Sequence, residues 1–151
     1  MVNKLHQRQD SVSNVHVGSS FEVVAQNYFA SQGIVLTVKY PLEIGVGKIK
    51  KKHNFDLGSS SPFVIVESKS YRWKPGNKVP SAKLSLWNEA MLYFITAPVK
   101  YCKILFGLRD YSETRKETLL DYSLRTYRHL IPNEIEFLEF DEVSGAVDSK
   151  H

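Results

Sequence analysis

Cysteine and long apolar runs are what this 151-residue chain has least of, and both shortages narrow the class of protein. The single cysteine, Cys102, has no partner for an internal disulfide, so the fold is expected to depend on a buried core. No apolar run approaches the ~20 residues that cross a bilayer, and the N-terminal segment MVNKLHQRQD has no apolar stretch of the kind found in secretory signals. We therefore expect a cytoplasmic protein with no membrane partner.

Internal repeats and low-complexity blocks are also absent, and the composition is that of one globular domain. Hydrophobic residues make up 42% of the chain and charged residues 24%, a balance that argues against disorder and allows a buried core. We expect the domain at residues 18–143. A flexible N-terminal arm (1–17) would precede it and a short tail (144–151) would follow it.

Positive charge is concentrated in the first half of the chain. Residues 1–80 contain 11 Lys and Arg against 5 Asp and Glu, whereas residues 81–151 contain 9 against 11. The run KIKKKH contributes four of these cations: Lys48, Lys50, Lys51 and Lys52. A basic cluster favours a polyanion such as nucleic acid, although such a run can also be ordinary solvated surface.

The hydrophobic pattern alternates between helical and strand periods. Helical spacing predicts helices at about residues 19–33, 81–96 and 112–129. Strand patterns occur at about residues 34–47, 53–57, 63–69, 101–108 and 134–140. The resulting order, α-β-β-β-α-β-α-β, predicts a single α/β domain with a mixed central β-sheet flanked by helices.

The second predicted helix has the clearest apolar stripe. Its members are Leu84, Trp87, Met91 and Phe94, widened by Leu86 and Ala90. Ser81 is expected to cap its N-terminus, because a serine side chain can accept a hydrogen bond from the first-turn backbone.

The stretch PFVIVESKSYRW (62–73) is an apolar strand that ends in two charges. Alternation places Glu67 and Lys69 on the same face as Ile65, where the apolar cover ends. A carboxylate in that position is partly desolvated and needs a cation, either lysine or a metal. The simplest interpretation is an ion pair between Glu67 and Lys69.

Asp56, on the preceding strand, offers a second carboxylate. Two carboxylates from adjacent strands suit Mg²⁺ or Mn²⁺, although Asp56 could also be an acceptor ahead of a turn. A hairpin centred near Ser60 would place Asp56 opposite Val64, ~10 Å along the strand from Glu67. The two carboxylates then meet only if the turn is longer or the strands splay or bulge.

The order of these residues resembles the PD-(D/E)XK nuclease superfamily, which includes restriction endonucleases and Holliday-junction resolvases. The matching elements are Asp56 and Glu67-Ser68-Lys69, behind a helix that carries Glu22 and ahead of an α-β-α-β tail. The resemblance covers about residues 18–141, with Phe55 where the motif name has proline. It implies a restriction endonuclease-like fold and magnesium-dependent hydrolysis of DNA.

The resemblance also assigns roles within the site. Asp56, Glu67 and the carbonyl of Ser68 would bind the metal, magnesium or manganese. Lys69 would orient or deprotonate the attacking water, and Glu22 would complete the catalytic set. Glu22 has an alternative use, because Ser19-x-x-Glu22 is also a capping box.

Cationic and aromatic residues follow the motif directly. Arg72, Trp73 and Lys74 would lie at the mouth of the site, where they suit contact with a nucleic-acid backbone and base stacking. Trp73 could equally pack its own loop.

Three hypotheses follow from the sequence. The first is a metal-dependent DNA endonuclease, for which double-strand cleavage would require a homodimer or two binding events. The second is a non-catalytic nucleic-acid-binding module on the same scaffold. The third is an unrelated α/β protein in which Glu67 and Lys69 are merely paired.

Overall fold

The computed structural model describes residues 21–150. It contains a helix of residues 21–31, then β1 (Thr37–Ile44), β2 (Lys51–Ser60), β3 (Phe63–Lys69), α2 (Ser81–Thr96), β4 (Cys102–Leu108), β5 (Tyr111–Ser112), β6 (Glu117–Thr118), α3 (Leu119–Thr126), the 3₁₀ turn η1 (Arg128–Leu130), β7 (Ile135–Phe140) and β8 (Val147–Lys150). The predicted order of major elements is present, and β5, β6 and β8 are additional. The expected N-terminal arm lies outside the described residues, whereas part of the expected tail forms β8.

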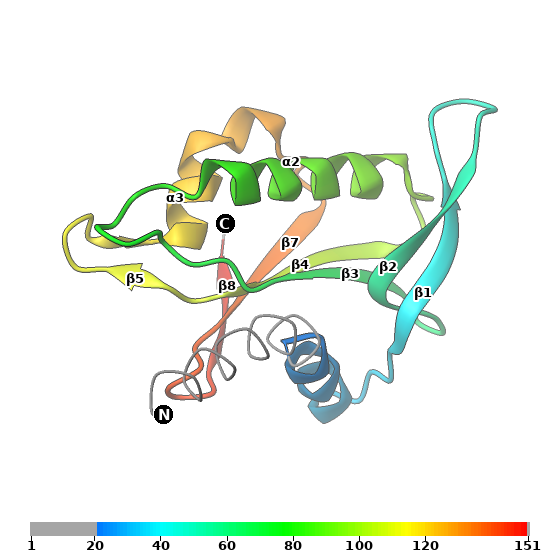
Figure 1. Ribbon diagram of the computed structural model, residues 1–151. Helices are drawn as coiled ribbons and strands as arrows, with labels where there is room; N and C mark the ends of the chain where they lie inside the picture. Colours follow the sequence, from blue (N-terminus) through cyan, green and yellow to red (C-terminus); the bar gives the residue numbers. More distant parts are fainter. Residues whose placement is uncertain (1–20, 151) are drawn as a thin grey trace, which may run out of the picture.

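Six strands form one mixed sheet in the order β1-β2-β3-β4-β7-β8. The pairs β1–β2, β2–β3 and β7–β8 are antiparallel, whereas β3–β4 and β4–β7 are parallel. The two parallel pairs need long connections, and these contain α2 and α3 respectively (Figure 1). The prediction of an α/β domain with a mixed central sheet is therefore confirmed.

The sheet separates two hydrophobic clusters. Helices α2 and α3 cover one face, and the helix of residues 21–31 covers the other (Figure 1). Strand β3 contributes to both clusters, because Ile65 faces α2 whereas Val64 and Val66 face the opposite side. Phe63 is an exception to the expected two-sided burial, since it is exposed at the start of the strand.

Helix α2 buries most of its predicted stripe. Its buried residues are Leu84, Trp87, Ala90, Met91 and Phe94, which recur at helical spacing. Leu86 is exposed instead, because it lies on the solvent side of the helix. The expected cap is also wrong: Pro80 occupies the N-cap position, no side chain caps the helix, and Ser81 is its first residue.

Helix α3 is shorter than the sequence pattern suggested. The β5–β6 hairpin takes up the first part of the predicted range. Thr118 then begins the helix with a capping box, in which its hydroxyl accepts from the backbone N–H of Asp121. Such a box defines a helix start, so the earlier residues are excluded from α3. None of the helices among residues 21–150 is long and apolar enough to span a membrane.

Candidate active site

The β2–β3 hairpin brings Asp56 and Glu67 to the same level of the sheet. Its register pairs Leu57 with Val66, so Asp56 and Glu67 are the residues that directly adjoin the last pair of the ladder. The expectation that Asp56 faces Val64 is wrong, because the turn between the two strands lies further along the chain than residue 60.

Strand β2 changes face at Asp56. Phe55 packs in the cluster on the α2 side, whereas Leu57 packs in the cluster on the opposite side, although residues two apart share a face in a regular strand. The β2–β3 ladder ends at Leu57, and beyond it the backbone N–H of Ser68 donates to Asp56 Oδ2 at 2.8 Å. The Ser68 hydroxyl donates to the same oxygen at 3.2 Å. This local distortion turns the Asp56 carboxylate toward the end of β3.

Glu67 is the most buried of the expected site residues, with 4% of its surface exposed. Lys69 Nζ lies 3.7 Å from Glu67 Oε2, so the two side chains share a face as alternation predicted. His53 Nε2 lies 3.0 Å from Glu67 Oε1. Each carboxylate oxygen therefore has its own nitrogen partner.

His53 is a site residue that the sequence did not assign. Its ring stacks on Tyr93 of α2, with centroids 3.8 Å apart and planes at 22°, and meets Phe55 edge-on at 4.7 Å. Burial, together with the positive charge of Lys69, lowers the pKa of His53 and favours the neutral imidazole. The available signal was its two-residue spacing from Phe55, which directs both side chains toward α2.

Glu22 brings a third carboxylate from the helix of residues 21–31. Burial, together with the negative charge of the nearby Asp56, raises the pKa of Glu22. The alternative capping-box role depends on Ser19, which lies outside the described residues. The position beside Asp56 is the one that the resemblance implied for Glu22.

Negative charge exceeds positive charge at the centre of this site. Burial and the negative charge of Asp56 together raise the pKa of Glu67 to about 9, against the opposing effect of Lys69. The metal-free cluster therefore retains a proton near neutral pH. Carboxylates and a backbone carbonyl are the oxygen donors that Mg²⁺ and Mn²⁺ prefer, so the chemistry of the donor set suits a divalent cation.

The side chains are nevertheless not gathered as in a formed metal site. Among residues 21–150, no group of three or more His, Cys, Asp or Glu side chains is arranged to hold a metal ion. Glu67 directs its oxygens at His53 and Lys69 instead. Binding of a cation by Glu67 would therefore require this carboxylate to exchange at least one of those contacts.

The expected nucleic-acid-binding residues fall into two groups. The first group, Lys48, Lys50, Lys51 and Lys52, is exposed at the outer end of the β1–β2 hairpin. In the second group, Arg72 forms a two-bond ion pair with Glu142 at 2.8 and 2.9 Å. Lys74 is exposed, and its backbone pairs with Lys78 across a narrow loop.

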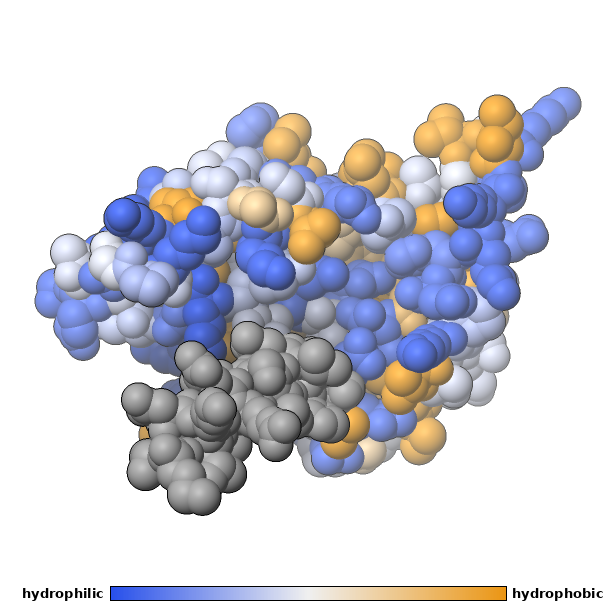
Figure 2. Space-filling model, viewed as in Figure 1, coloured by the Kyte–Doolittle hydropathy of each residue, from blue (hydrophilic) through white to orange (hydrophobic). Residues whose placement is uncertain are grey.

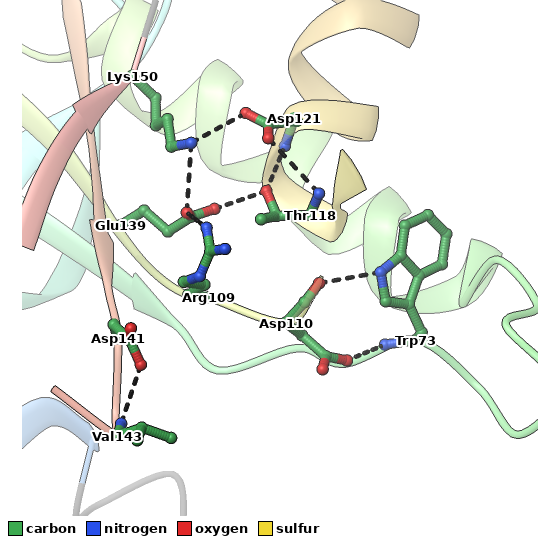
Figure 3. A network of polar contacts seen from close by, with 9 residues as sticks. All are labelled: Trp73, Arg109, Asp110, Thr118, Asp121, Glu139, Asp141, Val143 and Lys150. Carbon is green, nitrogen blue, oxygen red and sulfur yellow. Dashed lines mark hydrogen bonds and ion pairs between the residues drawn. The ribbon is translucent and has the colours of Figure 1, made fainter. Parts of the chain in front are cut away.

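Trp73 packs its own loop, which is the alternative considered for it. Its backbone N–H donates to the Asp110 carboxylate at 2.7 Å, and its indole N–H donates to the Asp110 carbonyl at 2.9 Å (Figure 3). The ring also meets Tyr122 edge-on and lies under the guanidinium of Arg115. These contacts restrict the access of a nucleic-acid base to the Trp73 ring.

A second buried carboxylate, Glu139 on β7, was also missed. It is 1% exposed, accepts a hydrogen bond from the Thr118 hydroxyl at 2.7 Å, and lies 3.4 Å from both Arg109 and Lys150 (Figure 3). Two cations and a hydroxyl offset its charge. The cluster thereby connects β7 with β8, with the residue after β4, and with Thr118 of β6 at the start of α3. The sequence carried a signal, because Glu139 shares the face of Ile135 and Phe137 on an alternating strand.

Comparison of the chain with protein-family models, curated proteins and solved structures finds no match.

Proposed function

We propose that this chain is a divalent-metal-dependent endonuclease that hydrolyses DNA phosphodiester bonds on a restriction endonuclease-like fold. The observation that carries the proposal is the contact of Asp56, within β2, with Ser68 near the end of β3, which brings Asp56 beside the neighbouring Glu67 and Lys69. The arrangement of elements is compatible with it, since an antiparallel β1–β2–β3 meander is followed by a helix and a parallel β4.

The catalytic roles follow from charge and position. Asp56, Glu67 and the Ser68 carbonyl would hold Mg²⁺ or Mn²⁺, which supplies charge neutralisation at the phosphate and activation of water. Lys69, whose side chain is only partly exposed, would orient the water and assist proton transfer. Glu22, close enough to Asp56 to feel its charge, would complete the set of carboxylates at the site.

His53 has a positioning role in this proposal. Its ring is fixed between Tyr93 and Phe55, and its Nε2 atom lies against Glu67. A neutral imidazole can stabilise either the protonated or the ionised carboxyl by choosing its tautomer. It therefore restrains the Glu67 side chain without adding a fixed positive charge.

The same contact favours the second candidate, a nucleic-acid-binding module without catalysis. In the described geometry, His53 occupies one oxygen of Glu67 and Lys69 approaches the other. If those contacts persist when DNA binds, the carboxylate would serve only to hold the strand ends together.

Nicking of a supercoiled plasmid separates the two candidates. The protein is expected to nick the plasmid in Mg²⁺ or Mn²⁺ and to stop when EDTA is added. Asp56→Asn keeps an oxygen acceptor for the Ser68 N–H but removes a negative charge, so we expect at least a ~100-fold loss of rate. Glu134→Gln, at an exposed residue outside the site, is the matched control and should nick normally.

Two results would contradict the proposal. Tight DNA binding without nicking in either metal would identify a binding module. Equal nicking by Asp56→Asn and the wild type would place the active centre elsewhere or reveal a contaminating nuclease.

A further inference from the structure

The outer end of the β1–β2 hairpin carries two exposed apolar side chains. Val46 is 80% exposed and Ile49 is 84% exposed. Their loop, residues 45–50, projects beyond the rest of the sheet (Figure 1), and apolar residues gather there between hydrophilic ones (Figure 2). Scattered exposed apolar residues are common, but two at the end of a projecting hairpin form a defined surface, here called the arm tip.

Two hydrogen bonds anchor the base of the arm tip. The Gly45 N–H donates to the Thr96 carbonyl at the end of α2 at 3.2 Å, and Lys50 Nζ donates to the Gly45 carbonyl at 2.8 Å. A side chain at position 45 would collide with the carbonyl of Ile49. Anchoring of its base restricts the freedom of the loop, and such restriction lowers the entropic cost of inserting side chains into a partner.

Charge around the arm tip selects the partner. Lys48, Lys50, Lys51 and Lys52 are all exposed around it or directly behind it. A second copy of the chain docked tip to tip would bring eight lysines together, and like charges oppose such an approach. A polyanion gains from the same four cations.

The hairpin also connects the arm tip to the candidate site. Strand β2 runs from Lys51 directly to Asp56, a separation of ~17 Å at ~3.3 Å per residue. Duplex DNA advances ~3.4 Å per base pair, so that separation corresponds to about five base pairs. One duplex could therefore contact the lysines and the carboxylates at once.

We propose that the β1–β2 hairpin is a DNA-binding arm whose tip residues, Val46 and Ile49, insert into a groove of the duplex as a wedge. The lysines follow the phosphates, and the apolar side chains partly unstack a base step five or more base pairs from the bond that is cut. Apolar wedges on DNA-binding proteins kink the duplex by about 20–90°. This placement of the DNA rests on the proposed function and adds a substrate class: duplexes that bend or open at low cost, such as mismatched or branched DNA.

The test measures bending in EDTA, where cleavage plays no part. A duplex labelled at its two ends with a fluorescent donor and acceptor reports its end-to-end distance by energy transfer. The wild type should increase the transfer. A Val46→Ser/Ile49→Ser variant should bind with an unchanged salt dependence but lose most of the increase. Val143→Ser, at another highly exposed valine in the loop before β8, should behave as the wild type.

Each outcome decides the proposal. An unchanged energy transfer for the wild type, or equal bending by the double variant, would overturn the wedge. A wild-type dimer that the double variant converts to a monomer in sedimentation analysis would identify the arm tip as a self-interface and would also overturn it. Bending without plasmid nicking would support the wedge and reject the endonuclease. Nicking without bending would support the endonuclease and reject the wedge.

Discussion

Glu67 is buried at a position that favours an apolar side chain, whereas the proposed metal binding requires an ionised carboxylate there. Burial and Asp56 both favour its protonated form, whereas Lys69 favours the ionised form. The metal-free protein meets these demands by keeping a proton on Glu67, and a divalent cation would replace that proton. Stability and metal binding are therefore linked through one carboxyl group.

The stability of the metal-free protein should fall between pH 7 and pH 9. The folded pKa of Glu67 is about 9, above its unfolded value near 4.5, so its stabilising contribution is complete below the unfolded pKa and is lost as the pH rises through the folded pKa. His53 is already neutral in this range because its pKa is lowered. Denaturant unfolding in EDTA should show a slope of up to ~1.4 kcal/mol per pH unit.

Glu67→Gln supplies the control for that slope. Glutamine keeps a polar side chain of the same size but cannot ionise, so most of the decline should disappear. Saturating Mg²⁺ should flatten the wild-type slope as well. An identical slope in Glu67→Gln would mean that Glu67 is ionised throughout this pH range.

Lys69→Ala should separate catalysis from metal binding. The variant keeps Glu22, Asp56 and Glu67, so Mn²⁺ should still bind in calorimetry, while the nicking rate should fall by ~2–4 powers of ten as expected for lost acid–base assistance. Lys100→Ala, at an exposed lysine over Phe63 at the opposite end of β3, is the matched control.

Thermal melting of Lys69→Ala tests the remaining hypothesis of a purely structural ion pair. Removal of one partner from such a pair leaves an uncompensated buried charge and costs ~3–5 kcal/mol. The endonuclease proposal expects a small effect, because Glu67 already keeps its proton in the metal-free protein. A large destabilisation combined with no Mn²⁺ binding by the wild type would support the structural pair.

At the scale of single residues, the sequence predicted contacts within one strand but not contacts between strands. The shared face of Glu67 and Lys69 followed from strand alternation alone. The meeting of Asp56 with Glu67 did not, because it depends on where the hairpin turns and on the change of face at Asp56. His53 was missed because its environment comes from Tyr93, a residue 40 positions away that only tertiary packing brings near.

Strands β1 and β2 are held in register by a close approach at Gly58. Gly58 lies under the side chain of Tyr40, whose hydroxyl shares a hydrogen bond with Tyr101 at 2.8 Å. The pairing of β1 with β2 thus depends on a glycine at position 58, which has no Cβ atom to collide with Tyr40. This arrangement supports both the arm and the strand that carries Asp56.

Gly58→Ala should destabilise the fold and Gly107→Ala should not. A Cβ atom at position 58 would overlap the ring and Cβ of Tyr40, whereas at position 107 its closest neighbour would be 3.6 Å away. Overpacking of this kind costs ~1–3 kcal/mol, measurable as a lower denaturant midpoint. Equal midpoints for the two variants would show that Tyr40 moves aside freely.

The elements themselves were predicted well where periodicity was strong. Helix α2 and the central strands lie within a few residues of their expected positions. Helix α3 was predicted too long because Tyr111–Thr118 forms a hairpin whose sequence also has polar residues at helical spacing. The capping box at Thr118 was the local signal for the true start.

Across the whole molecule, the basic and acidic halves of the sequence form different parts of the fold. The basic half of the sequence forms the helix of residues 21–31 and the β1–β2–β3 meander, and the acidic half forms the rest of the sheet with α2 and α3. The sequence could predict this polarity, because it follows from composition. It could not predict that the meander extends outward as an arm (Figure 1).

Substitution of Lys50, Lys51 and Lys52 by alanine should weaken DNA binding for all sequences. Each phosphate contact contributes ~0.9 to the slope of log affinity against log salt, so the slope should decrease by up to ~2.7. A matched variant lacking Lys100, Lys116 and Arg128, three exposed cations outside the arm, should bind almost normally. Equal affinities and slopes for both triple variants would show that the lysine run is ordinary surface.

The outermost strand of the meander has a consequence for the behaviour of the protein at high concentration. β1 is an edge of the sheet. A long, regular edge strand can pair with a strand of another chain, and such pairing leads to aggregation. Here Pro41 removes a hydrogen-bond donor from that edge, and Lys39, with φ of 54°, interrupts the extended backbone two residues earlier. These features protect the edge against self-association, so an apolar arm tip can remain exposed to water without making the hairpin a template for fibres.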